Sequence, residues 1–194
     1  MKNLLEQQIR IHGRGGQGVV AMAEILAIAF FIDGYEVQAF PNFGVERSGA
    51  PIQSYVRISH KNILTREHIY EPDILLILDS TLIGKANIFS GIKKTTKIIV
   101  NTNLNLSELI EIIKTNIKLP NGFDFKNIMN IDATSIALNI FGKNIVNTAM
   151  LGSLVNISGL LKLESAKIAI KKKFSDKGND IVEKNIEAIN KAIK

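Results

Sequence analysis

The chain of 194 residues contains 24 Lys and Arg against 18 Asp and Glu, a net charge of +6, and is 46% apolar and 22% charged. These values are typical of a globular protein and exclude a disordered one, and the length suits a single domain over residues 1–194. The lysines gather near the end, in KIAIKKKF and NKAIK, without a recognition motif. Nucleic-acid binding is therefore not expected.

The sequence contains no cysteine, which excludes disulfides, iron–sulfur clusters and thiolate metal sites held by this chain. His12, His60 and His68 lack the spacing of metal ligands, so we expect them on the surface or in turns and predict no metal site. The longest apolar run, ILAIAFFI, is too short to cross a bilayer, and Met1–Gln8 lacks signal-peptide character. We expect a cytoplasmic protein that does not bind membranes.

The first predicted elements flank a glycine-rich turn. Ile9–His12 is predicted as a strand, and Gln17–Asp33 as a helix that ends at Gly34, a residue suited to a left-handed cap. This helix is apolar almost all round, so it must be covered on both sides.

Strands and helices alternate along the rest of the chain. Strands are predicted at Glu36–Phe40, Ile52–Ser59, Asp73–Leu78, Lys97–Val100 and Asn127–Ile131. Helices are predicted at Leu106–Ile117, Thr134–Phe141, Thr148–Leu161, Ser165–Phe174 and Asp180–Ile193, the last with Asp180 and Glu183 placed as a capping box. This alternation predicts the α/β class, as a three-layer α/β/α arrangement with a mostly parallel, Rossmann-like sheet.

The glycine-rich turn is the first candidate site. Its backbone N–H groups, an arginine and the positive end of the following helix together favour an anion such as phosphate. The candidate residues are Gly13, Arg14, Gly15, Gly16, Gln17 and Gly18. The glycine spacing also fits a dinucleotide fingerprint, but Phe40–Pro41 stands where a ribose-binding acid belongs, and Val19–Val20 replaces the Lys-Ser/Thr of a Walker loop. Alternatively, the glycines serve only tight packing between helix and strand.

The second candidate site lies in the long loop Pro41–Pro51. Arg47 suits a phosphate, a carboxylate or an acid of a neighbouring subunit, and Glu46 orients it; neither is expected to be catalytic. Asp79, Asn101 and Asp132 follow three other strands, and we expect each of them to cap a turn or helix.

Four segments in order, IRIHGRGGQGVV, AFPNFGVERSGAPIQSYVRIS, YEPDILLILDSTL and NIVNTAMLGSL, closely resemble the gamma subunit of pyruvate:ferredoxin oxidoreductase and its 2-oxoacid relatives. The first two segments are more similar to the pyruvate and 2-oxoisovalerate branch than to the 2-oxoglutarate or indolepyruvate branches. The resemblance implies a multisubunit enzyme that converts pyruvate, coenzyme A and oxidised ferredoxin to acetyl-coenzyme A, carbon dioxide and reduced ferredoxin.

The resemblance also implies a division of labour between subunits. Thiamine diphosphate, Mg²⁺ and iron–sulfur clusters are expected in the alpha, beta and ferredoxin-like delta subunits, and this chain would hold no cofactor and no catalytic residue. Its role would be assembly and closure of the complex, with the glycine turn and Arg47 helping to receive the diphosphate of coenzyme A. Two alternatives stay open: a stand-alone dinucleotide-binding oxidoreductase, and a coenzyme A or nucleotide-binding module.

Overall fold

The computed structural model describes residues 6–42 and 49–193, and these build one mixed sheet of six strands. The strands are β1 (Gln7–Arg14), β2 (Glu36–Asn42), β3 (Pro51–Ser59), β4 (Ile74–Ile77), β5 (Lys97–Asn101) and β6 (Ile128–Ile131), in the spatial order β2-β3-β1-β4-β5-β6. Strands β1, β4, β5 and β6 pair in parallel, whereas β3 is antiparallel to both of its neighbours. The predicted strands and the mostly parallel sheet are confirmed.

The described helices are α1 (Val19–Ile32), α2 (Leu106–Asn116), α3 (Ala133–Phe141), α4 (Asn147–Ser158), α5 (Leu163–Phe174) and α6 (Asn179–Ala192). Short 3₁₀ turns lie at Ser80–Leu82, Phe125–Asn127 and Ser175–Lys177. All six predicted helices are present with ends shifted by a few residues. None of the described helices combines the length and apolar character that a membrane crossing needs.

The capping box predicted for the last helix is wrong. Helix α6 starts at Asn179, so Asp180 already lies inside the first turn, where its carboxylate binds Lys184 at 2.8 Å, and the N-cap Gly178 has no side chain to offer. A capping box forms instead at α2, where Asn105 and Glu108 each accept a backbone N–H from the other.

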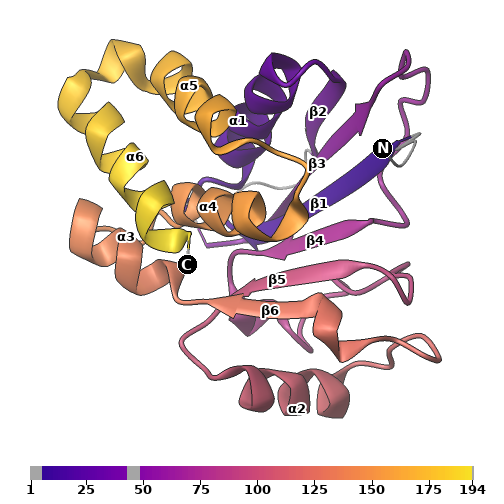
Figure 1. Cartoon of the computed structure of the whole chain (residues 1–194). Coiled ribbons are helices and arrows are strands. Elements are labelled where there is room, and N and C mark those ends of the chain that lie inside the picture. Colours follow the sequence, from indigo (N-terminus) through magenta and orange to yellow (C-terminus); the bar gives the residue numbers. More distant parts are fainter. Residues whose placement is uncertain (1–5, 43–48, 194) are drawn as a thin grey trace.

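One face of the sheet carries most of the helices. Helix α1 packs on β2 and β3 and is covered from outside by α5, and α4 and α6 lie beside them (Figure 1). Isoleucines of β1 and the apolar side chains of α1 and α4 form the centre of the large core cluster. The expectation that α1 must be covered on both sides is confirmed for most of its length, although Phe31 remains 71% exposed.

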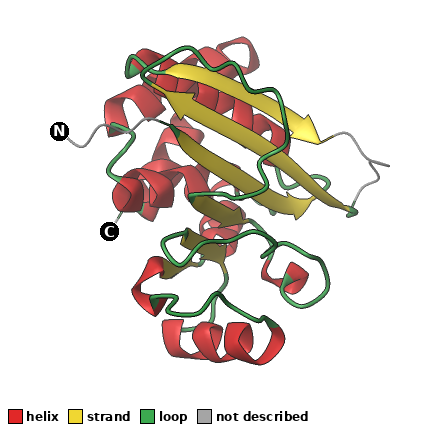
Figure 2. Cartoon of the chain, turned by 90° about the vertical axis from the view of Figure 1, so that its right-hand side faces the viewer, coloured by secondary structure: helices red, strands yellow, loops and turns green. Residues whose placement is uncertain are grey.

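The opposite face is covered in two different ways. Over β4, β5 and β6, α2 contributes Leu109 and Ile113 to a second core cluster. Over the rest of that face, the segment 60–73 runs across the strands as an irregular loop (Figure 2). Buried Arg10 and Arg57 hold it by donating hydrogen bonds to its backbone carbonyls. The third layer is therefore helical on only one half of the sheet.

Candidate functional site

The carboxyl ends of β1, β4, β5 and β6 meet at one edge of the sheet because these strands run in parallel. The glycine turn begins in the last residues of β1 at this edge, and the end of β2 and the start of β3 lie at the same edge. Ligands of open α/β sheets bind at such an edge, because helix N-termini and free backbone donors converge there. We therefore place the candidate site here.

The glycine turn is shaped by close approach of backbone and side chains. A Cβ atom on Gly13 would lie 2.6 Å from Cγ2 of Val19, and Gly18 adopts a φ of +83° that suits glycine. The turn is also paired with the start of β3, since Gly15 donates to the carbonyl of Ala50 at 3.0 Å. Gly13 therefore allows close packing between β1 and α1.

The N-terminus of α1 carries no side-chain cap. Its N-cap residue is Gly18, and no acidic residue lies in the first turn. By contrast, α3 is capped by Asp132, whose side chain accepts the N–H of Ser135. An uncapped helix end presents N–H groups and a partial positive charge, which favours a negatively charged group.

Arg14 and Gln17 tie the glycine turn to the end of β4. The Arg14 guanidinium lies 3.3 Å from Asp79 Oδ2 and donates to Thr81 Oγ1 at 2.9 Å and to the carbonyl of Gly49 at 3.0 Å. Gln17 accepts the N–H of Arg14 at 2.8 Å and donates to Asp79 at 2.9 Å. The Arg14 side chain remains 30% exposed. Each of the three guanidinium nitrogens of Arg14 therefore has a partner, while the side chain stays partly exposed at the edge.

The pKa of Asp79 is set by opposing influences. Burial favours the neutral acid, but hydrogen bonds from Thr81 and Gln17 and the charge of Arg14 together hold the pKa of Asp79 below its usual value. Asp79 is therefore an ionised anchor for the turn at neutral pH.

Glu46 and Arg47, the second pair of predicted site residues, lie outside the described residues. The described parts of the loop are Pro41 and Asn42 at the end of β2 and Gly49 onward. Gly49 donates to the carbonyl of Gly15 at 3.3 Å, so the end of the loop contacts the glycine turn.

The three polar residues at other strand exits each accept a backbone N–H of a turn or helix, as expected. Asp79 caps the 3₁₀ turn Ser80–Leu82, Asp132 caps α3, and Asn101 Oδ1 accepts the N–H of Thr134 in the first turn of α3 at 3.1 Å. Sequence reasoning missed that they share one cavity. Together with Gln17 they line a polar cavity of about 340 Å³ next to the glycine turn.

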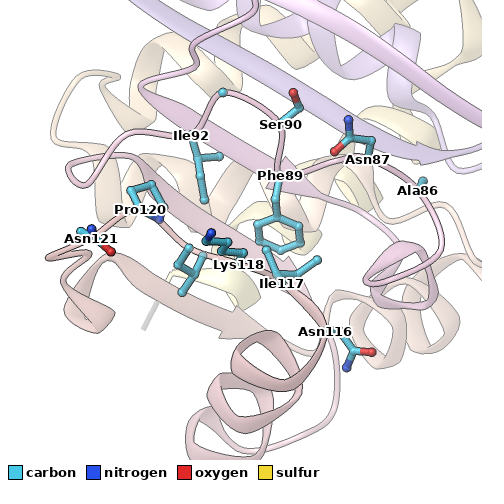
Figure 3. A pocket seen from close by; sticks show the side chains of 12 residues that line it. Ala86, Asn87, Phe89, Ser90, Ile92, Asn116, Ile117, Lys118, Pro120 and Asn121 are labelled. Atoms are coloured by element: carbon cyan, nitrogen blue, oxygen red, sulfur yellow. The ribbon is translucent and has the colours of Figure 1, made fainter.

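A larger hollow of about 620 Å³ lies elsewhere, between residues 86–92 and 116–121 (Figure 3). Phe89, Ile92 and Ile117 contribute apolar walls, and Lys118 is the charged residue of its described lining. It contains none of the predicted site residues and lies away from the carboxyl ends of the parallel strands. Because topology and motifs agree on the strand edge, the smaller cavity is the better candidate.

The expectation for His12 is wrong. Its side chain is buried in β1, and burial, reinforced by the nearby charge of Arg10, lowers the pKa of His12 from 6.5 to about 3. His60 and His68 are exposed and stack on Tyr35 and Tyr55 respectively. Within residues 6–42 and 49–193, no three His, Asp or Glu side chains gather in a way that could hold a metal ion.

Comparison with known proteins identifies the family. The model of the family "Pyruvate ferredoxin/flavodoxin oxidoreductase" matches residues 8–194. The chain belongs to this family. The fold class predicted above is shared with solved members: the pyruvate oxidoreductase subunit PORC from Thermotoga maritima aligns with a TM-score of 0.80 and 32% identity, covering 97% of this chain and 96% of that one.

Named relatives match along almost their whole length. The "Pyruvate/ketoisovalerate oxidoreductases common subunit gamma" of Pyrococcus furiosus is 44% identical over 185 residues, which are 95% of this chain and 94% of the relative. The "Pyruvate synthase subunit PorC" of Methanocaldococcus jannaschii is 44% identical over 181 residues, 93% of this chain and 92% of the relative. The resemblance seen in the sequence motifs is confirmed.

A more distant match shows the fold alone. The 2-oxoglutarate:ferredoxin oxidoreductase of Magnetococcus marinus, solved with 2-oxoglutarate, coenzyme A and succinyl-CoA bound, aligns with a TM-score of 0.73 at 20% identity. The alignment covers 97% of this chain but 30% of the Magnetococcus chain. In that protein the same fold is one part of a longer polypeptide.

Proposed function

We propose that this chain is the gamma subunit of a multisubunit pyruvate (2-oxoacid):ferredoxin oxidoreductase. The observation that supports it most directly is the family match over residues 8–194, together with relatives of nearly equal length named as gamma or PorC subunits. In this function pyruvate and coenzyme A are converted to acetyl-coenzyme A and carbon dioxide, and ferredoxin is reduced. The chain acts as one cytoplasmic domain.

The catalytic machinery of the proposed complex belongs to other subunits. The sequence has no cysteine for an iron–sulfur cluster, and the described part of the chain offers no metal-binding group of acidic and histidine side chains. We assign thiamine diphosphate, Mg²⁺ and the clusters to alpha, beta and delta subunits. This chain contributes to assembly and closes the complex.

Purification from the native cell tests this proposal. The tagged chain should bring down a thiamine-diphosphate subunit and a small ferredoxin-like subunit, and the assembly should reduce ferredoxin with pyruvate and coenzyme A. The chain alone should show neither activity nor visible absorption. Ferredoxin reduction by the pure chain, or its recovery without a thiamine-diphosphate subunit, would contradict the proposed function.

We further propose that the glycine turn helps to receive the diphosphate of coenzyme A. The uncapped N-terminus of α1 and the partly exposed guanidinium of Arg14 supply positive charge at the strand edge, next to a cavity lined by hydrogen-bonding side chains. Arg47 is assigned to the same role from the sequence.

Substitution of Arg14 separates this role from subunit contact alone. In the assembled enzyme, Arg14→Ala should raise the KM for coenzyme A about tenfold or more and leave the KM for pyruvate unchanged, because of these two substrates only coenzyme A carries a diphosphate. Arg14→Lys, which keeps the charge, should recover part of the affinity. An unchanged KM for coenzyme A with a lower yield of complex would mean that the turn contacts a subunit only.

A further inference from the structure

The side chain of Asn147 lies against the last residue of the glycine turn. Asn147 is the first residue of α4 and is 3% exposed. A Cβ atom on Gly18 would lie 2.7 Å from both Cγ and Nδ2 of Asn147, so the amide occupies the space where any other side chain would go. Gly18 is also the N-cap of α1. The position of the Asn147 amide therefore bears directly on the start of α1.

The backbone N–H of Thr148 holds this amide, and the side chain of Thr148 is tied to α6. Asn147 Oδ1 accepts the N–H of Thr148 at 2.9 Å, which turns its Nδ2 toward Gly18. The Thr148 hydroxyl, fully buried, donates its single proton to Oδ1 of Asn185 on α6 at 2.6 Å, so this hydroxyl fixes Thr148 and the Thr148 N–H fixes the Asn147 amide. We call Asn147, Thr148 and Asn185 the polar chain.

The far end of the polar chain is anchored on α6. Asn185 Nδ2 donates to the carbonyl of Ile181 at 2.7 Å, which fixes which atom of the amide faces Thr148. Helix α6 lies directly against α4 (Figure 1), and a Cβ atom on Gly152 of α4 would lie 2.6 Å from the carbonyl oxygen of Ile189. Such close packing leaves little room for one helix to shift on the other.

We propose that the polar chain positions the glycine turn for its ligand. The chain keeps the Asn147 amide on Gly18, and Gly18 in turn sets the direction of the first N–H groups of α1 at the strand edge. This inference rests on the proposed coenzyme A role of the turn and adds that α4 and α6 set its affinity for the diphosphate. Asn147, Thr148 and Asn185 are positioning residues in this scheme.

Removal of one buried hydroxyl tests the proposal. In Thr148→Val, Asn185 Oδ1 loses its donor, and a buried acceptor without a partner destabilises the local arrangement. In the assembled oxidoreductase we expect the KM for coenzyme A to rise about fivefold or more, with kcat within about twofold and the KM for pyruvate unchanged. Thr148→Ser retains the hydroxyl and should keep the KM of the parent enzyme.

Ser153→Ala provides a matched control on the same helix. Ser153 is 3% exposed, and its hydroxyl has no hydrogen-bond partner among the described residues, so its removal leaves the polar chain intact. This variant should retain the parent KM for coenzyme A. An equal rise in KM in Ser153→Ala and Thr148→Val would show a general loss of helix packing and would overturn the proposal.

A measurement without ligand separates this inference from the proposed function. The amide of Met22 donates to the carbonyl of Gly18 at 2.8 Å, so its hydrogen exchange in the full chain reports on the start of α1. We expect exchange about tenfold faster in Thr148→Val than in Thr148→Ser, with Ile74–Ile77 unaffected. Unchanged exchange at Met22 would overturn the positioning role, whatever the result for coenzyme A. If Arg14→Ala leaves the KM for coenzyme A unchanged while exchange at Met22 rises, the coenzyme A role fails and the positioning of the turn stands.

Discussion

The buried imidazole of His12 should make the stability of this protein depend on pH. Because the folded-state pKa of His12 is lowered from 6.5 to about 3, the imidazole stays neutral in the folded chain, whereas the unfolded chain takes up a proton below about pH 6.5. The unfolded state therefore binds more protons between these two values. The free energy of unfolding falls as the pH decreases from about 6.5 toward about 3.

The size of the effect follows from the two pKa values. At about 1.36 kcal/mol per pKa unit, a shift from 6.5 to about 3 gives a loss of about 2 kcal/mol in the free energy of unfolding between pH 7 and pH 5. The limiting loss below pH 3 is about 5 kcal/mol by the same linkage relation. A loss of this order is a large fraction of the stability of a typical domain.

Comparison of the parent chain with His12→Gln isolates this contribution. Urea unfolding of both chains at pH 5, 6, 7 and 8, followed by circular dichroism, gives the free energy of unfolding of each chain as a function of pH. Subtracting one curve from the other cancels the contributions of all titrating groups that both chains contain. We expect the parent to lose about 2 kcal/mol more than His12→Gln between pH 7 and pH 5. If the unfolding free energies of the two chains changed equally with pH, the reasoning would be refuted. An NMR titration of the folded chain in which His12 takes up a proton near pH 6 would refute it as well.

Two glycine substitutions test the close contacts. Gly18→Ala combines a φ of +83° with a Cβ that would lie 2.7 Å from Asn147, so we expect the free energy of unfolding in urea to fall by about 2–4 kcal/mol. Gly142 has a φ of +65° and no neighbour within 4 Å, so Gly142→Ala should lower the free energy of unfolding by only about 1 kcal/mol. Equal losses in the two variants would show that the contact with Asn147 adds nothing to the cost of a side chain at position 18. Gly152→Ala places a methyl group 2.6 Å from the carbonyl oxygen of Ile189 and should cost about 1–3 kcal/mol, and a stability equal to that of the parent would contradict the tight packing of α4 on α6.

The secondary structure was predictable because its signals are local. The continuous apolar run at Ile74–Ile77 and the helical spacing in α6 both reflect burial of one segment, which a short stretch of sequence records. The capping box was misplaced because the N-cap of α6 is Gly178, and a shift of two residues moves Asp180 from the cap into the first turn. Helix boundaries depend on such small differences, whereas the existence of the helix does not.

The candidate site was predictable in part. The turn around Gly13 and the anchors Asp79 and Asp132 were found because strand exits and glycine spacing are visible in the chain. The cavity that these exits share was missed, since it depends on which strands are neighbours. His12 was misjudged because the alternation of apolar and polar residues along β1 predicts one buried face of the sheet. It does not reveal that the other face is also covered at His12.

The sequence by itself determined the chemistry that this chain can and cannot contain: no cysteine for a cluster, a glycine turn before a long apolar helix, and four family segments in order. Only the tertiary structure decided which distant groups meet, such as Asn147 on Gly18 and Arg10 beneath the segment 60–73. The reason is that turn and helix preferences act over a few residues, whereas burial is settled by the packing of segments far apart in the chain.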